Sequence, residues 1–164
     1  MSNQVPSATH PAVEKVTAAL AEAGATGQVR WLDDAATTAA LAAERLGIAV
    51  GQIANSLVFL FDGVPTLVLT SGSHRVDTAW LGEQVGATVT RASKEQVKEA
   101  TAQVIGGVAP VGHPAPVPTY VDTALAAHDE VWAAAGHAKT VFPTTFDELV
   151  RITGGTPTAV APEG

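Results

Sequence analysis

The spacing of apolar residues in the first part of the chain predicts a helix, a strand and a second helix. Val13, Val16 and Leu20 fall on one helical face, after a proline that suits a first helical turn, so a helix is predicted at 11–24. A short apolar run and a second periodic run with threonine before it and glycine after it follow. They predict a strand at 28–33 and a helix at 37–47.

The middle of the chain predicts a β-hairpin. Two runs rich in β-branched and aromatic residues occupy 55–72 and are separated by Asp62-Gly63, a pair typical of two-residue hairpin turns. We expect this hairpin to lie at the centre of the sheet.

The rest of the chain alternates capped helices with short strands. Asp77 and Gly86 suit the two ends of one helix, and Ser93 suits the start of another. The predicted elements are helices at 76–86, at 93–104 and from Thr144 or Thr145 to Val150, a short helix from Asp122, and strands at 87–92, 117–122, 131–136, 139–144 and 158–161. Hairpins mixed with helices predict an α/β domain of the mixed α+β kind, not a doubly wound nucleotide fold.

Composition predicts one domain that folds by itself. Of the 164 residues, 46% are hydrophobic and 15% are charged, so the chain can bury enough apolar surface, and we expect residues 1–164 to form a single domain. The absence of cysteine excludes disulfides, thiolate zinc sites and cysteine nucleophiles. Neither an export segment nor an apolar run of about 20 residues is evident, so a cytoplasmic protein without membrane contact is expected.

The net charge narrows the expected partners. Nine Lys and Arg against sixteen Asp and Glu give a charge of −7, the wrong sign for a protein that coats nucleic acid by neutralising phosphates. Any nucleic-acid contact is therefore expected to be local. His74 and Arg75 form a basic pair that suits either a phosphate or an ion pair with Asp77. Lys94 and Lys98 share a helical face that suits a tRNA contact or, more simply, a solvated surface.

The segment VIGGVAPVGHP, at 104–114, follows neither helical nor strand periodicity. Gly106 and Gly107 permit unusual backbone angles and leave amides uncovered, and Pro110 fixes the direction in which the loop leaves. Such amides suit an oxyanion hole for acyl transfer. The same residues also suit a tight connection between a helix and a strand, and the spacing alone favours this simpler interpretation.

Four motifs occur in order between about residues 10 and 160. They are the hairpin, a GxxxP loop at 106–110, Val121-Asp122 after the next strand, and Ala135-Gly136 at a late strand end. In this order and spacing they resemble the YbaK family of free-standing aminoacyl-tRNA editing domains, which is similar to the editing domain inserted in bacterial prolyl-tRNA synthetases.

The resemblance implies a fold and an activity. The fold is a mixed, barrel-like β-sheet core surrounded by helices, and the activity is trans editing, in which the ester at the 3′ end of a mischarged aminoacyl-tRNA is hydrolysed. The amides of Gly106 and Gly107 would hold the substrate carbonyl, Pro110 would hold the loop, and a hydroxyl of the substrate's own ribose would assist water. No metal or cofactor is implied, and the chain has neither a GxSxG elbow nor an HExxH helix. The implied partners are the aminoacyl-tRNA 3′ end and an aminoacyl-tRNA synthetase.

The resemblance also implies a set of substrate contacts. These are Asn55, Ser56, Val108, Ala109, Asp122, Gly136 and His137. Asp122 also suits a helix cap, and His137 also suits a surface position. His113 suits a proton shuttle at the mouth of the site or a solvated loop position.

Two positions depart from the family pattern. Asn55 stands where the family has a lysine that contacts the terminal adenosine or its phosphate, and asparagine keeps the hydrogen bonding but not the charge. Ala109 stands where many relatives have serine or threonine. Two alternatives stay open: a module that binds aminoacyl-tRNA or a synthetase without hydrolysis, and a small-molecule hydrolase or nucleotide binder on the same fold.

Overall fold

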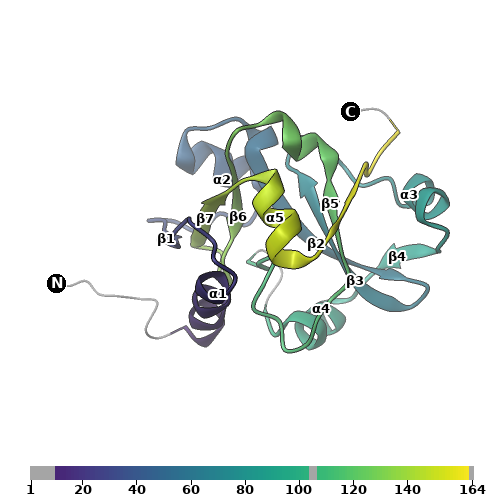
Figure 1. The fold of residues 1–164 in the computed structure, drawn as a ribbon, viewed down its shortest axis with the longest axis horizontal. Helices are drawn as coiled ribbons and strands as arrows, with labels where there is room; N and C mark the ends of the chain where they lie inside the picture. The colour runs from purple at the N-terminus through teal and green to yellow at the C-terminus, as the bar shows by residue number, and fades with distance from the viewer. Residues whose placement is uncertain (1–9, 104–106, 163–164) are drawn as a thin grey trace.

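The structure is a computed structural model that describes residues 10–103 and 107–162 (Figure 1). Within these ranges eight strands join one mixed sheet in the order β1-β7-β6-β2-β3-β5-β8, and β4 pairs with β2 beside this path. The strands are β1 (Arg30–Trp31), β2 (Ile53–Phe61), β3 (Val64–Ser71), β4 (Val89–Arg91), β5 (Thr119–Asp122), β6 (Val131–Ala134), β7 (Thr140–Thr144) and β8 (Thr156–Thr158). The predicted mixed α+β class is confirmed.

The helices begin and end largely where the capping residues predict. In the described ranges they are α1 (Pro11–Glu22), α2 (Ala39–Leu46), α3 (Thr78–Val85), α4 (Lys94–Thr101) and α5 (Phe146–Thr153), with the 3-10 turns η2 (Val50–Gln52) and η3 (Thr123–Ala127). The side chains of Thr38, Asp77, Ser93 and Thr145 each accept a hydrogen bond from a backbone N–H in the first turn. These bonds satisfy donors that a helix start otherwise leaves unpaired.

The central hairpin forms as predicted. β2 and β3 pair antiparallel from Ala54 opposite Ser71 to Phe61 opposite Val64. Asp62 and Gly63 make the turn with φ of 51° and 82°, the positive values that a tight hairpin turn requires.

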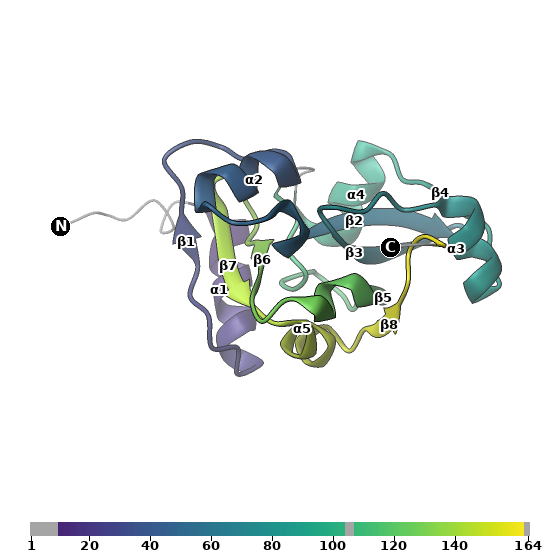
Figure 2. The ribbon, with the colours of Figure 1, turned by 90° about the horizontal axis from the view of Figure 1, so that it is seen from above.

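Helices cover the sheet on more than one side. In Figure 2, α1 and α5 lie along one side of the sheet and α2 lies on the other. Val16 of α1, Val97 of α4 and Leu149 of α5 belong to the largest cluster of buried apolar residues, which packs against β3 and β5. Leu81 of α3 packs in a second cluster with Val68 of β3. The elements around the hairpin are therefore held mainly by apolar burial.

Several elements differ from their predicted bounds, and three of these differences have a clear structural cause. The strand expected at 28–33 has only two residues, Arg30–Trp31. The helix expected at 93–104 ends at Thr101, because Ala102 takes the left-handed conformation with φ of 60°. The last strand lies at 156–158, not at 158–161, because it pairs in parallel with β5 from Tyr120 to Asp122. In each case pairing or a local backbone conformation overrides the apolar pattern.

Across the described residues, no helix combines the length and the apolar character that crossing a membrane requires.

Candidate active site

A gap along one edge of β2 positions the site. β3 pairs with one edge of β2 over most of its length, so β6 and β4 share the other edge. β6 pairs with residues 53–54 and β4 pairs with residues 59–61. In the part of the chain that the structure describes, residues 55–58 therefore have no strand neighbour on that edge. An open strand edge offers backbone donors and acceptors to a ligand.

Strand alternation identifies the groups that face this gap. The Gly72 N–H donates to the Ile53 carbonyl oxygen over 2.8 Å, so the odd-numbered residues of β2 exchange hydrogen bonds with β3. The backbone N–H and C=O of Ser56 consequently point toward the open edge. The Ser56 Oγ is buried and has no hydrogen-bond partner among the described residues. Ser56 thus brings hydrogen-bonding capacity to the gap.

A cleft of about 730 Å³ opens at the gap. Its walls come from residues 53–59 of β2, the ends of β4 and β6, the turn that follows β3, and the start of α2. Val108 contributes from the loop after α4, and Trp132 contributes from β6. The cleft is large enough for a nucleoside or an aminoacyl group.

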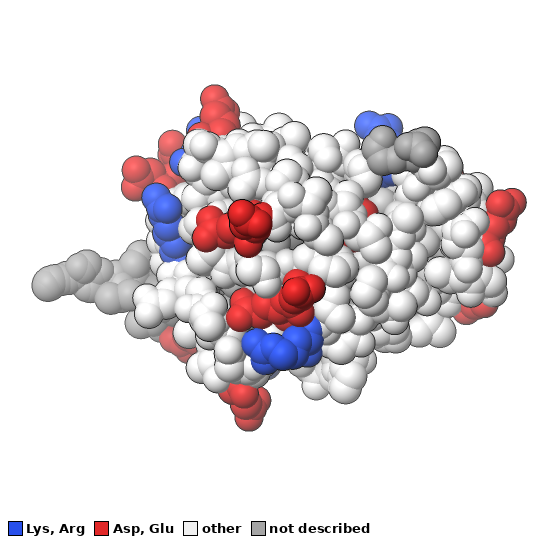
Figure 3. All heavy atoms as spheres, turned by 45° about the horizontal axis from the view of Figure 1, so that its top comes forward, with Lys and Arg blue, Asp and Glu red and all other residues white. Residues whose placement is uncertain are grey.

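The charge of the cleft is opposite to that of the protein. Arg75 and Arg91 line it and are its only residues of fixed charge, and no Asp or Glu is among its lining residues in the described ranges. On the face drawn in Figure 3, acidic side chains are scattered and basic side chains form no broad patch. A chain with net charge −7 therefore has a positive cleft. Such local focusing favours an anionic ligand at this place.

Asn55 and Thr70 lie opposite each other on the paired strands and both line the cleft. Cross-strand neighbours have Cβ atoms about 5 Å apart, so the two side chains share one end of the cleft. Asn55 is half-buried and Thr70 is buried. The amide of Asn55 can donate and accept hydrogen bonds there but carries no charge.

The glycine-rich loop is tied down by a buried glutamine. The side chain of Gln103 accepts a hydrogen bond from the Ala109 N–H over 2.7 Å and donates to the Val111 carbonyl over 3.2 Å. The Ala109 amide is therefore occupied within the protein. The Val108 amide has no hydrogen-bond partner among residues 10–103 and 107–162. Pro110 is buried, and Gly106 lies outside the described residues.

Gly107 holds the loop against the segment that follows β6. Its carbonyl oxygen accepts from the Gly136 N–H over 2.8 Å. A Cβ at Gly107 would lie 2.7 Å from the carbonyl carbon of His137, closer than side-chain carbons approach backbone. Glycine is required at this position for close packing, whatever its role toward a ligand.

His137 and His113 both have a lowered pKa, but neither is among the residues that line the cleft. The His137 ring packs against Trp31, with ring centroids 5.3 Å apart. Partial burial, with His10 and Lys139 nearby, lowers the pKa of His137. The His113 Nε2 is 2.9 Å from the Ala109 carbonyl oxygen. Burial lowers the pKa of His113 more than this hydrogen bond raises it, so His113 is a structural link and not a solvated loop residue.

Asp122 lies beside the cleft, where its carboxylate accepts several hydrogen bonds. It is 1% exposed, and its Oδ1 accepts from the Ala124 N–H at the start of η3, as predicted for a cap. Its Oδ2 accepts from the Ser71 N–H over 2.9 Å and lies 3.1 Å from Nδ1 of His74. His74 therefore pairs with Asp122, whereas Asp77 caps α3.

The structure brings some of the predicted site residues together and separates others. Asn55, Ser56 and Val108 line the cleft. The remaining described members of the predicted set are not among its lining residues: Gly107, Ala109, Pro110, Asp122, Gly136 and His137. His74, Arg75, Arg91 and Trp132 line the cleft without having been predicted as its members. In the sequence, the basic pair at 74–75 was the available signal for this part of the cleft. Asp122, which pairs with His74, lies 48 residues further along the chain.

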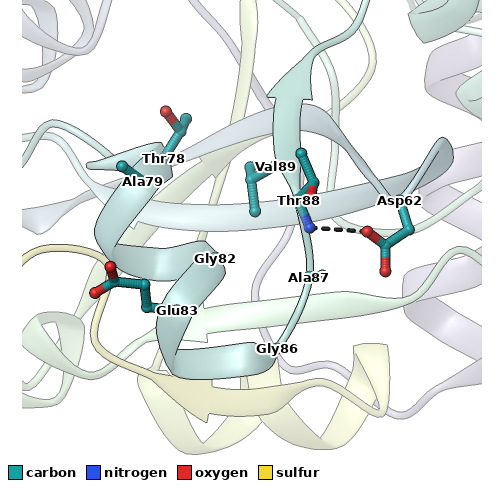
Figure 4. A pocket seen from close by; sticks show the side chains of 9 residues that line it. All are labelled: Asp62, Thr78, Ala79, Gly82, Glu83, Gly86, Ala87, Thr88 and Val89. Atoms are coloured by element: carbon teal, nitrogen blue, oxygen red, sulfur yellow. Dashed lines mark hydrogen bonds between the residues drawn. The ribbon is translucent and has the colours of Figure 1, made fainter.

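A second, shallower hollow lies beside α3 and shares Thr78 with the cleft. Figure 4 shows it between Gly82 of α3, Gly86 at the C-cap of that helix, Thr88 and Val89 at the start of β4, and Asp62 at the hairpin turn. The Asp62 carboxylate accepts from the Thr88 N–H over 2.8 Å, so it already serves to join the two turns. This hollow has acidic and no basic lining residues in the described ranges.

Comparison with known proteins gives the chain a family context. The model of the family described as aminoacyl-tRNA editing domain matches residues 33–152, which include the gap, the loop and Asp122. The chain is 29% identical over 122 residues to the uncharacterized protein YwhH of Bacillus subtilis (strain 168), covering 74% of this chain and 78% of that protein. It is 36% identical over 70 residues to a proline--tRNA ligase of Maridesulfovibrio salexigens, covering 42% of this chain and 12% of that ligase.

Solved structures share the fold. One, described as a candidate trans-editing enzyme for prolyl tRNA synthetase, is 39% identical with a TM-score of 0.87, covering 94% of this chain and 98% of that chain. Another, the hypothetical protein APE2540, is 28% identical with a TM-score of 0.82, covering 89% of this chain and 98% of that chain.

Proposed function

The chain belongs to the aminoacyl-tRNA editing domain family, and from that premise we propose that it hydrolyses the ester joining a wrong amino acid to the 3′-terminal adenosine of tRNA. The observation that carries this proposal is the cleft at the β2 gap: among the residues that the structure describes, its only fixed charges are two arginines, although the protein as a whole is acidic. A tRNA end is an anion that needs such a local contact.

The arginines offer a substitute for the charge that Asn55 lacks. Arg75 and Arg91 are exposed at the cleft, where their guanidinium groups can bind the phosphates next to the terminal adenosine. Asn55 would then hydrogen-bond the adenosine, and Ser56 would contact the aminoacyl group across the open strand edge. In this proposal arginine and asparagine side chains together hold the tRNA end, in place of the single lysine of the family pattern.

The loop supplies the electrostatic part of the reaction. In this proposal the amides of Gly106, Gly107 and Val108 stabilise the carbonyl oxygen as it gains negative charge, and Ala109 and Pro110 keep the loop in shape. The bond from Gln103 to the Ala109 amide supports a fixed loop conformation. A hydroxyl of the substrate ribose assists water. Gly136 and His137 act by packing against the loop, and Asp122 acts through the residues that it orients.

Hydrolysis in trans gives such a site its purpose. An apolar synthetase pocket discriminates one methylene group by only about 1 to 3 kcal/mol, so a second site that removes small wrong amino acids restores fidelity. The likeness to a candidate trans-editing enzyme for prolyl tRNA synthetase supports an aminoacyl-tRNA synthetase as the protein partner. We propose that the whole chain acts as one editing domain.

A deacylation panel tests this proposal. The protein is incubated with tRNAs charged with Ala, Ser, Cys, Thr and Pro, and ester loss is compared with the spontaneous rate. At least one ester should be lost well above that rate. Ala134→Trp, which places a large side chain in the cleft, should abolish the activity, whereas Ala126→Trp at an exposed position of η3 should not. If no ester in the panel is lost faster than the spontaneous rate, the proposed hydrolysis is contradicted.

Asn55 favours one further candidate function. If a missing lysine removes catalysis but not recognition, the protein binds aminoacyl-tRNA without turnover. Binding of a non-hydrolysable, amide-linked aminoacyl-tRNA together with no ester loss in the panel would support this module. Ester loss would exclude it.

A further inference from the structure

A histidine and a buried carboxylate are paired in the wall of the cleft. Nδ1 of His74 lies 3.1 Å from Oδ2 of Asp122. His74 lines the cleft with 16% of its side chain exposed, whereas the Asp122 side chain is 1% exposed. The two meet because β5 runs parallel to β3 and the turn after β3 folds back toward the end of β5.

The surroundings of Asp122 determine which ring nitrogen carries the proton. Its carboxylate accepts hydrogen bonds from the Ser71 N–H at 2.9 Å, the Thr70 hydroxyl at 3.3 Å and the Ala124 N–H at 3.0 Å. A carboxylate that serves these donors is an acceptor for His74 as well, so Nδ1 donates. In the neutral ring the lone pair is then on Nε2, and no described residue forms a hydrogen bond with Nε2.

The ring is mounted on a fixed turn. The His74 N–H donates to the Ser71 carbonyl oxygen over 2.9 Å, and the Ser71 hydroxyl donates to the Gly51 carbonyl oxygen over 2.9 Å. Ser73 shares a hydrogen bond with the same hydroxyl at 3.0 Å. A base that is held in one orientation loses little freedom on reaction, which is the advantage of a preorganised site.

The pair stands next to the proposed adenosine contact. Thr70, which bonds to Asp122, lies opposite Asn55 on the paired strands. His74 is therefore at the same end of the cleft as Asn55. The ester to be cleaved is on the ribose of the adenosine that Asn55 is proposed to hold.

We propose that Nε2 of His74 is the general base of the reaction, with Asp122 as its positioning residue; this proposal rests on the proposed deacylase function. Nε2 takes a proton from water as the water oxygen forms a bond to the ester carbonyl carbon. When the bond between that carbon and the ribose oxygen breaks, the ribose oxygen takes the electron pair and receives the proton from Nε2. The products are the free amino acid and a tRNA with a free terminal hydroxyl. His74 thus adds a base to the water activation that the substrate ribose assists.

The test compares His74→Ala with the unmodified protein on the ester that the panel identifies. Single-turnover deacylation should become about 100-fold slower, as expected for loss of a general base. Affinity for the amide-linked aminoacyl-tRNA should change less than about threefold, since the base acts on water. Added imidazole should restore part of the rate, measured against the same imidazole without protein. His128→Ala, a histidine change outside the cleft lining, serves as the matched control.

His74→Gln keeps a polar side chain in the wall if the alanine variant does not fold, and the same rate loss is expected. Three results overturn the proposal. If either variant retains a rate within about threefold of the unmodified protein, His74 is not the base, while the deacylase function stands. If the rate falls in step with affinity and imidazole restores nothing, the pair is structural. If the unmodified protein hydrolyses no ester, the proposed function fails and the base assignment fails with it.

Discussion

The cleft and the hollow beside α3 are neighbours that share Thr78, yet they differ in charge and in what their polar groups do. The hollow is acidic, and the carboxylate of Asp62 is already bonded to the Thr88 amide. The cleft is basic and contains an open strand edge, the imidazole of His74, and the Ser56 hydroxyl, which has no hydrogen-bond partner among the described residues. The difference shows that polar groups left free by the fold mark a functional site better than the presence of a hollow does.

The largest effect is expected from removing the positive charge that the cleft has and the hollow lacks. The double variant Arg75→Ala, Arg91→Ala should weaken binding of an amide-linked aminoacyl-tRNA about 100-fold, since each charge-assisted phosphate contact contributes about 1.5 kcal/mol. The slope of log affinity against log salt concentration should become shallower, by the amount expected for the loss of about two phosphate contacts. Binding titrations at several salt concentrations measure both quantities.

The matched control for that experiment is the double variant Lys94→Ala, Lys98→Ala, which removes two charges from α4 outside the cleft lining. It should change affinity by less than a factor of about three, as expected of surface charges that make no direct contact. Equal losses in both double variants would show that the arginines act only through net charge.

The next comparison is between a glycine of the loop that carries Val108 into the cleft lining and a glycine of the hollow. Gly107→Ala should lower the free energy of unfolding by about 2 to 3 kcal/mol and slow deacylation, because its Cβ would overlap the His137 backbone. Gly86→Ala at the hollow has open space but a φ of 74°, so it should cost only about 1 kcal/mol and leave deacylation unchanged. Urea unfolding and the deacylation rate decide the outcome. Similar results for both variants would argue against tight packing of the loop.

A charge added to each region should have a smaller effect. Asn55→Lys should raise affinity for the aminoacyl-tRNA about fivefold, because it adds a cation to the cleft and one phosphate contact to the salt dependence. Thr88→Lys adds the same charge at the exposed rim of the hollow and should leave affinity unchanged. Binding titrations at one salt concentration suffice. A gain in both variants would indicate nonspecific attraction.

The smallest effect is expected from pH. Burial lowers the pKa of His113 in the folded protein, so below its ordinary value near 6.5 the unfolded chain binds more protons. Stability should therefore fall as pH decreases through and below this value. Urea unfolding at pH 7.5 and pH 5.5 measures the change. His113→Gln should show a smaller loss; an identical loss would assign it to other groups.

The sequence by itself determined the local structure, because local structure depends on neighbouring residues. The hairpin turn at Asp62-Gly63 and the caps at Asp77 and Ser93 need only their own backbone angles and the next few residues, and all three are as predicted. The order of motifs also led to the family, since that order is a property of the chain. Strand ends were less predictable, because β1 and β8 are limited by the strands they pair with.

Only the tertiary structure decided where the cleft lies and which residues face it. The gap at Asn55 and Ser56 exists because β6 and β4, from distant parts of the chain, pair with the two ends of β2 and leave its middle open. In the same way His74 finds Asp122 across 48 residues. Strand pairing joins residues by register and not by distance along the chain, so no local pattern carries this information.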